Sequence, residues 1–86
     1  MNVHLSLYGA FRQYEPAGAI ELQLPDGADI AQLRDALSRY ASEHWPDFRS
    51  GLLTSSAFAS EASILRDREA VPPDGRVAVL PPVSGG

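Results

Sequence analysis

Residues 76–86 read Arg76-Val77-Ala78-Val79-Leu80-Pro81-Pro82-Val83-Ser84-Gly85-Gly86, and they contain the last strand of the predicted sheet and an unusual tail. The first five residues are almost continuously apolar, which favours a strand buried on both faces, as in a central or parallel-paired position. The proline pair has no backbone N–H to donate to a sheet ladder, so this strand should end at Leu80. The two prolines also favour an extended polyproline conformation, which would project the chain away from the body. We therefore predict a folded domain over residues 1–80 and an extended, flexible tail over residues 81–86.

Two further strands are predicted in the first third of the chain. Val3-His4-Leu5-Ser6-Leu7 alternates apolar and polar residues, and Ile20-Glu21-Leu22-Gln23-Leu24 does the same. This period of two is typical of strands that bury one face. We expect the two strands to pair in antiparallel fashion, since they are consecutive in the sequence.

One long amphipathic helix is predicted after the second strand. Asp29 stands at the N-cap position, and Gln32 lies three residues further on, as in a capping box. Apolar residues recur at helical spacing over residues 30–41, which indicates a helix of about four turns. Trp45-Pro46 ends the helix, because the residue before a proline disfavours helical dihedral angles. We interpret the charged residues between positions 34 and 43 as a solvated helix face.

The region between this helix and the last strand is the least regular part of the sequence. Leu52-Leu53 should be buried, and we expect weak strands near residues 56–60 and 62–66, joined by a turn. A helix that crosses one face of a mixed sheet is the simplest way to bury its apolar stripe. The first and last strands are both strongly apolar, which a position side by side in the middle of the sheet would explain. The predicted fold is therefore α+β: a ubiquitin-like β-grasp over residues 1–80, with one main helix packed on one face of a mixed sheet.

The composition excludes several classes of function. The chain has 86 residues, enough for one domain but too few for an elaborate enzyme pocket. With 11 acidic and 7 basic residues its net charge is -4, which argues against nucleic-acid binding, because nothing offsets repulsion from a polyanion. The absence of cysteine excludes disulfides, thiolate zinc sites and thiol catalysis.

Particular residue types exclude further classes of function. The apolar runs are too short to span a bilayer, so we expect no membrane association and a cytoplasmic protein. All 7 basic residues are arginine, so there is no internal lysine for a Schiff base or an isopeptide bond. His4 and His44 fall on different predicted elements, and we expect no metal site. His44 also crowds a helix end with Ser42 and Asp47, which is a poor arrangement for a hydrolytic triad.

The α-carboxylate of Gly86 is the only functional group that the tail can offer. Six extended residues reach about 20 Å, and a glycine pair can thread a tunnel that a side chain would block. The ionised carboxylate is a poor electrophile. Activation as a mixed anhydride with AMP would allow attack by an amine, a thiol or a sulfide, and the last of these yields a thiocarboxylate. The alternative is an ordinary frayed terminus, although a terminal glycine pair arises by chance in about one chain in two hundred.

The tail resembles that of a known family, the ubiquitin-like sulfur carriers, and most closely that of the small subunit of molybdopterin synthase. The shared pattern is an apolar strand, Pro-Pro-Val, a small residue and Gly-Gly. Leu5-Ser6-Leu7-Tyr8-Gly9-Ala10-Phe11-Arg12 is similar to the family's opening strand and first turn. Leu24-Pro25-Asp26-Gly27-Ala28-Asp29-Ile30-Ala31-Gln32-Leu33 is similar to its entry into the helix. The resemblance covers nearly the whole chain, and its most specific part is the tail.

The resemblance implies a chemical role for the terminal glycines. A ubiquitin-activating-type enzyme would use ATP to adenylate the carboxylate of Gly86, which follows Gly85, and sulfur transfer would then make the thiocarboxylate. The sulfur would pass to a cyclic pterin precursor in molybdenum cofactor biosynthesis. This chain would bind no cofactor and would be a sulfur-donating, non-catalytic subunit, because the family's catalytic side chains lie on the large subunit.

The resemblance also implies where partners bind. The tail would insert into the large subunit of molybdopterin synthase, and the complex would be a heterotetramer with two small subunits. An apolar patch at the base of the tail is what an inserting complex needs. The implied partner-binding residues are Tyr8, Leu80, Pro81, Pro82, Val83 and Ser84.

Three other functions remain open on the sequence alone. The same carrier chemistry could serve thiamine or cysteine biosynthesis, whose carriers also end in Gly-Gly. A ubiquitin-like adaptor would bind partners without chemistry at the tail, and it would tolerate loss of Gly86. A protein modifier would be joined to lysines of other proteins through an isopeptide bond.

Overall fold

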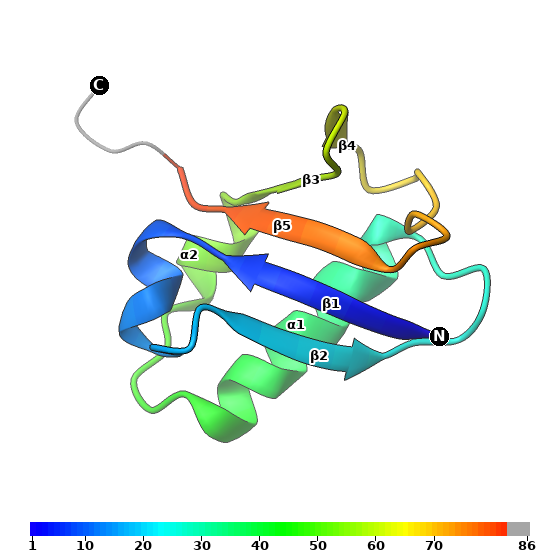
Figure 1. Cartoon of the computed structure of the whole chain (residues 1–86). Coiled ribbons are helices and arrows are strands. Elements are labelled where there is room, and N and C mark those ends of the chain that lie inside the picture. Colours follow the sequence, from blue (N-terminus) through cyan, green and yellow to red (C-terminus); the bar gives the residue numbers. More distant parts are fainter. Residues whose placement is uncertain (83–86) are drawn as a thin grey trace.

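Strands from the two ends of the chain lie side by side in the centre of the sheet. The computed structural model describes residues 1–82 and shows a five-stranded sheet in the order β2-β1-β5-β3-β4. The main helix crosses one face of this sheet (Figure 1). The elements in chain order are β1 (Asn2–Leu7), the 3-10 helix η1 (Gly9–Gln13), β2 (Ala19–Gln23), α1 (Ile30–His44), α2 (Ser50–Thr54), β3 (Ala57–Ala59), β4 (Ile64–Leu65) and β5 (Arg76–Leu80).

The pairing of β1 explains why the sheet is mixed. β1 pairs antiparallel with β2, as predicted, with Leu5 opposite Ile20. On its other side β1 pairs in parallel with β5, with Leu5 opposite Val77. β5 pairs antiparallel with β3, where Phe58 lies opposite Val79. The predicted central position of the first and last strands is confirmed.

The core lies between the sheet and α1. The odd residues of β1, Val3, Leu5 and Leu7, are fully buried, as their alternation with polar residues predicted. They pack in one cluster with the buried stripe of α1, which consists of Ile30, Leu33, Leu37 and Ala41. Burial of such aliphatic side chains stabilises the fold by about 1.5–3 kcal/mol each.

The ends of α1 follow the sequence signals. Asp29 Oδ1 accepts a hydrogen bond from the Gln32 backbone N–H at 2.8 Å, and Gln32 Oε1 accepts one from the Asp29 N–H at 3.0 Å. The predicted capping box is therefore present. Trp45 is the C-cap residue and is only 3% exposed, so it both ends the helix and enters the core.

Four features differ from the sequence-based expectations or were not foreseen. β5 is buried on one face only, through Val77 and Val79, because a single helical layer covers the sheet and leaves Ala78 and Leu80 half-buried. Two short helices, η1 and α2, were not predicted, because five residues are too few for a helical period to register. The weak strands were placed correctly but are short, as β3 and β4.

Arg34 is the fourth of these features, because it does not belong to a solvated helix face. Its guanidinium donates hydrogen bonds to the backbone oxygens of Leu53 and Ser56, each at 2.9 Å. It also pairs with Asp67 at 2.9 Å and lies over the ring of Phe58 at 4.8 Å. The side chain therefore holds α2 and the turn after β4 against α1.

In residues 1–82 no helix is both long enough and apolar enough to cross a membrane.

Candidate functional site at the base of the tail

The candidate site begins at the end of β5, where the strand pairing stops. Leu80, the last residue of β5, lies opposite Ala57 on β3. Pro81 is half-buried and Pro82 is exposed, so the chain leaves the surface over these two residues. Figure 1 shows this exit at the end of the molecule that also carries η1. The predicted strand boundary at Leu80 is confirmed.

Tyr8 lies at the same end, one residue past β1. Tyr8 is 44% exposed, and it is one of two large hydrophobic residues in residues 1–82 that are exposed. The guanidinium of Arg12 lies over the Tyr8 ring at 5.6 Å from its centroid, within the range of a cation–π contact. Arg12 Nε also donates to the backbone oxygen of Leu7 at 3.0 Å. The end of β1 and the first turn of η1 are thereby fixed to one another.

Gly9 packs directly against the exit of the chain. It adopts φ +58°, a left-handed conformation that favours glycine. A Cβ at this position would stand 2.6 Å from Cγ of Pro81, far inside van der Waals contact. The absence of a side chain at Gly9 therefore makes room for the proline ring. Sequence analysis did not single out Gly9 or Arg12. A signal for Gly9 was available in its position two residues after β1, the strand that pairs in parallel with β5.

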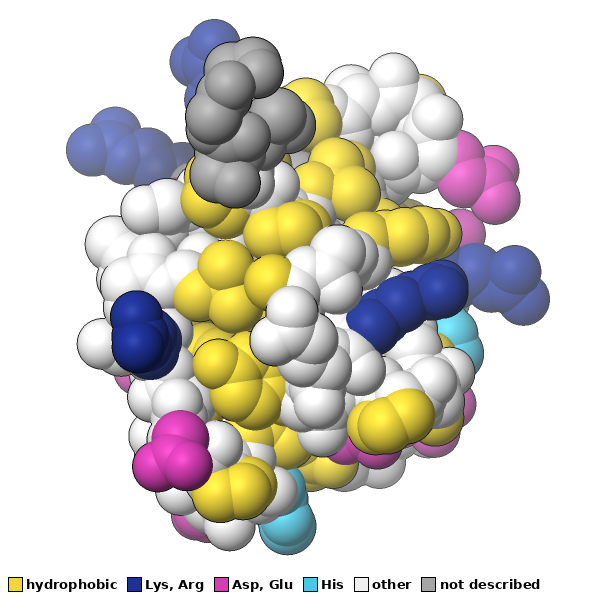
Figure 2. Space-filling model, turned by 90° about the vertical axis from the view of Figure 1, so that its left-hand side faces the viewer, with side chains coloured by type: hydrophobic (Ala, Val, Ile, Leu, Met, Phe, Trp, Pro, Cys, Tyr) yellow, Lys and Arg dark blue, Asp and Glu magenta, His cyan; other side chains and the backbone are white. Residues whose placement is uncertain are grey.

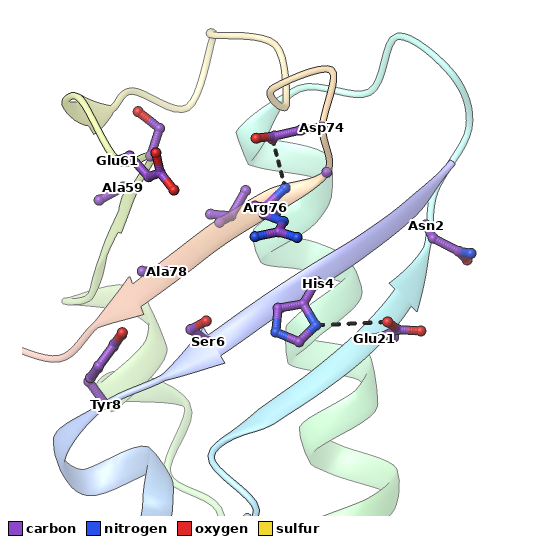
Figure 3. A pocket seen from close by; sticks show the side chains of 13 residues that line it. Asn2, His4, Ser6, Tyr8, Glu21, Ala59, Glu61, Asp74, Arg76 and Ala78 are labelled. Carbon is purple, nitrogen blue, oxygen red and sulfur yellow. Dashed lines mark hydrogen bonds and ion pairs between the residues drawn. The ribbon is translucent and has the colours of Figure 1, made fainter.

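A shallow hollow of about 680 Å³ adjoins this region on the face of the sheet opposite α1. Its floor is made of small residues on neighbouring strands, with Ser6 opposite Ala78 and Ala78 opposite Ala59. Figure 3 shows charged side chains around this floor and Tyr8 at the end near the tail. The lining residues include Asn2, His4, Glu21, Glu61, Asp74 and Arg76.

The charged residues of the hollow are mostly solvated. His4 Nδ1 lies 3.8 Å from Glu21 Oε1, with both side chains about half or more exposed. Asp74 Oδ1 accepts a hydrogen bond from the Arg76 backbone N–H at 3.0 Å (Figure 3).

Hydrophobic side chains also gather over the end of the molecule that carries the tail. Figure 2 shows them as a band that runs from beside the grey residues down this end. Several hydrophobic side chains packed on the core are only partly buried, among them Tyr14, Tyr40, Phe48 and Leu52. Exposed apolar patches of this kind often mark surfaces that contact other proteins.

The structure brings together four of the sequence-predicted site residues. Tyr8, Leu80 and Pro81 lie at one end of the sheet, and Pro82 follows them into solvent. Val83, Ser84, Gly85 and Gly86 lie outside the described residues, so their roles stay predictions. Among the residues that are described, no three His, Asp or Glu side chains cluster in a way that could hold a metal ion.

The mixed sheet with its helix on one face defines a ubiquitin-like β-grasp domain, and comparison with known proteins gives its family. The model of the ThiS family matches residues 5–86, nearly the whole chain. The chain therefore belongs to the ThiS family of ubiquitin-like sulfur carriers. No curated protein matches it at a significant level.

A solved structure supports the fold independently. The crystal structure of SAMP1 from Haloferax volcanii matches with a TM-score of 0.74 at 18% sequence identity, and the match covers 100% of both chains. At this identity the likeness concerns the fold, and the predicted ubiquitin-like β-grasp with its mixed sheet is confirmed.

Proposed function

We propose that this chain is the sulfur-carrying small subunit of molybdopterin synthase. Its membership of the ThiS family supports sulfur-carrier chemistry, since the family match extends through Gly86. The closing Pro-Pro-Val-Ser-Gly-Gly, which resembles the tail of that subunit, supports this particular client. The observation that carries the proposal is the combination of the family match with a chain that leaves the sheet at Pro81 and is exposed at Pro82.

The proposed reaction has three steps, all of which involve the terminal carboxyl group of Gly86. The carboxylate of Gly86 attacks the α-phosphate of ATP on an adenylating enzyme of the ubiquitin-activating type, and pyrophosphate leaves. A sulfur nucleophile at the oxidation level of sulfide then displaces AMP and leaves a thiocarboxylate. That sulfur finally passes to a cyclic pterin precursor on the large subunit, and water restores the Gly86 carboxylate. ATP is thus a substrate of the activating enzyme, so the chain itself needs no bound cofactor and acts in the cytoplasm, where ATP is supplied.

The proposed partners contact the chain at the base of the tail. Tyr8 and Leu80 supply apolar surface there. The half-buried Pro81 follows Leu80 and leads to the exposed Pro82. Val83 and Ser84 enter the partner with the terminal glycines. The large subunit supplies the catalytic side chains, and two copies of each subunit form a heterotetramer. This chain acts as a sulfur-bearing cosubstrate, which agrees with the generally non-catalytic role of its family.

The family match supports a second client equally well. Sulfur carriers for thiamine biosynthesis use the same adenylation and thiocarboxylate chemistry and belong to the same family. The two proposals differ only in the enzyme that receives the sulfur. They separate when thiocarboxylated chain is mixed with the large subunit of molybdopterin synthase and its pterin precursor, or with the thiazole-forming enzyme and its substrates.

The test of the carrier chemistry is the intact mass of the chain after incubation with ATP, a sulfur donor and extract of its own organism. We expect a shift equal to one oxygen replaced by sulfur, located at Gly86 and dependent on ATP. A variant that lacks Gly86 should show no shift. If the full chain keeps its mass while a control carrier in the same extract is modified, the carrier proposal is wrong and a non-covalent adaptor takes its place.

A further inference from the structure

The parallel register of the two central strands brings Gly9 alongside Pro81. Leu7 lies opposite Val79, and every earlier pair of β1 and β5 has the same separation in sequence. Two residues further along both chains, the same register pairs Gly9 with Pro81. The ladder itself stops at this point, because Pro81 has no N–H and Gly9 turns into η1 at φ +58°.

The contact between these two residues leaves no space for a side chain. A Cβ on Gly9 would stand 2.6 Å from Cγ and 3.5 Å from Cδ of Pro81. Carbon atoms attract one another optimally at about 3.5–4.0 Å, so the first distance is strongly repulsive. The pyrrolidine ring is closed onto the backbone, so Cγ can move only by a change of ring pucker and cannot swing away as a free side chain would. Relief beyond what repuckering allows requires a shift of the backbone at Gly9 or at Pro81.

The Gly9 side of this contact is the better anchored. Phe11, two residues into η1, is fully buried, and its N–H donates to the Tyr8 oxygen at 3.3 Å. Arg12 Nε holds the Leu7 oxygen at 3.0 Å. On the Pro81 side of the contact, the only described residue that follows is Pro82, which is exposed. A clash would therefore displace the tail and leave the turn in place.

We propose that Gly9 is a positioning residue for the tail: its bare Cα seats the Pro81 ring and so fixes the direction in which the chain leaves the sheet. This inference rests on the proposed carrier function, because direction matters only if the tail is delivered to an enzyme. A proline pair is stiff, so a change of angle at Pro81 is carried into Pro82 and on to whatever follows. Misdirection of a reactive group by about 1 Å can cost a hundredfold in rate.

The experiment compares Gly9→Ala with Gly27→Ala. Both glycines have a left-handed backbone, with φ +58° and +82°, so both variants carry the same kind of conformational strain. A Cβ on Gly27 meets nothing within 4 Å, whereas one on Gly9 meets Pro81. We expect kcat/KM for formation of the Gly86 thiocarboxylate to fall at least about tenfold in Gly9→Ala and to stay within about twofold in Gly27→Ala. Gly9→Ala combined with Pro81→Ala, which removes Cγ and Cδ of the ring, should return to the rate of Pro81→Ala alone.

A second measurement reads the geometry without the chemistry. Residual dipolar couplings of the Cα–Hα bonds of Pro81 and Pro82, relative to those of β5, report the exit direction in each variant. We expect them to change in Gly9→Ala and to match the wild type in Gly27→Ala. Unchanged couplings in Gly9→Ala overturn the inference, whether or not the chain carries sulfur.

The outcomes separate this inference from the proposed function. If the wild-type chain is never thiocarboxylated, the carrier proposal fails, and the couplings alone then decide whether Gly9 directs the tail. If the wild type is thiocarboxylated and Gly9→Ala reacts equally fast, the positioning role is wrong while the carrier proposal stands. If both alanine variants slow the reaction equally, backbone strain is the cause and the contact with Pro81 is not.

Discussion

Trp45 Nε1 donates a hydrogen bond to Glu15 Oε1 at 3.1 Å and thereby ties the segment after η1 to the end of α1. The same carboxylate oxygen accepts from the Tyr40 hydroxyl at 3.4 Å. The indole also stacks on Tyr14, with ring centroids 5.5 Å apart. One partly buried carboxylate thus holds two aromatic side chains directly, and Tyr14 joins them through its stacking on Trp45.

Removal of this acceptor should destabilise the fold. Trp45 is 3% exposed, so Glu15→Ala leaves a buried indole N–H without a partner. We expect the free energy of unfolding to fall by about 1–3 kcal/mol. Glu15→Gln keeps a carbonyl acceptor and should cost less. Chemical denaturation followed by the fluorescence of Trp45, the only tryptophan, measures both values; equal stability of Glu15→Ala and wild type would contradict the proposed role of the hydrogen bond.

Tyr40 should make stability depend on alkaline pH. Burial, and then the negative charge and hydrogen bond of Glu15, raise the pKa of Tyr40 above its usual 10.0. The unfolded chain therefore loses this proton first, so the stabilisation is complete below about pH 10 and is lost as pH rises through the raised pKa of the folded state. Tyrosinate absorbance, measured with Tyr8 and Tyr14 replaced by Phe, reports the pKa. Glu15→Gln should lower the pKa of Tyr40 only part of the way, because burial is the largest cause; a full return to the usual value would show that burial contributes nothing.

Arg34 and Arg39 form a matched pair on α1. Arg34 is 24% exposed and bonds two backbone oxygens as well as Asp67, whereas Arg39 is 75% exposed and pairs with Asp35 four residues away. Arg34→Ala leaves backbone acceptors without a donor and should lower the free energy of unfolding by about 2–3 kcal/mol. Arg39→Ala should cost no more than about 0.5 kcal/mol. Urea denaturation of the two variants provides the comparison, and similar losses would show that the Arg34 contacts are no stronger than a surface ion pair.

Tyr8 should contribute to partner binding and little to stability. The side chain is 44% exposed at the base of the tail, and aromatic residues in such positions often dominate interface energies. We expect Tyr8→Ala to weaken binding to the purified adenylating enzyme by about tenfold, or about 1.4 kcal/mol. Ile64→Ala is the control, because Ile64 is 59% exposed but lies on the edge strand β4. Calorimetric titration should show unchanged affinity for this control, and unchanged affinity in Tyr8→Ala as well would place the interface elsewhere.

Local sequence patterns predicted most of the fold. Alternation in residues 3–7 and 20–24 predicted β1 and β2, and the Asp29–Gln32 capping box predicted the start of α1. The central pairing of β1 with β5 followed from the apolar character of both strands. These features depend on residues close together in the sequence, or on burial that a whole strand must share, and a single sequence displays both.

The contacts that the sequence did not reveal join distant residues. Arg34 reaches Asp67, and Gly9 meets Pro81, only because the tertiary fold brings them together. A helical charge pattern cannot show that one arginine turns inward to backbone oxygens, and a five-residue helix such as α2 has no measurable period. At the candidate site, Tyr8 and Leu80 were predicted to be neighbours from the resemblance, while the supporting contacts of Gly9 and Arg12 needed the structure.

The parallel pairing of β1 with β5 also has a mechanical consequence. Asn2 begins β1 and Leu80 ends β5, so these residues lie at opposite ends of two adjacent strands. Tension applied between the N-terminus and the tail would slide the strands past one another and load their hydrogen bonds simultaneously, whereas an antiparallel terminal hairpin would open one bond at a time. An enzyme that grips the tail and pulls therefore meets the sheet along its most resistant direction.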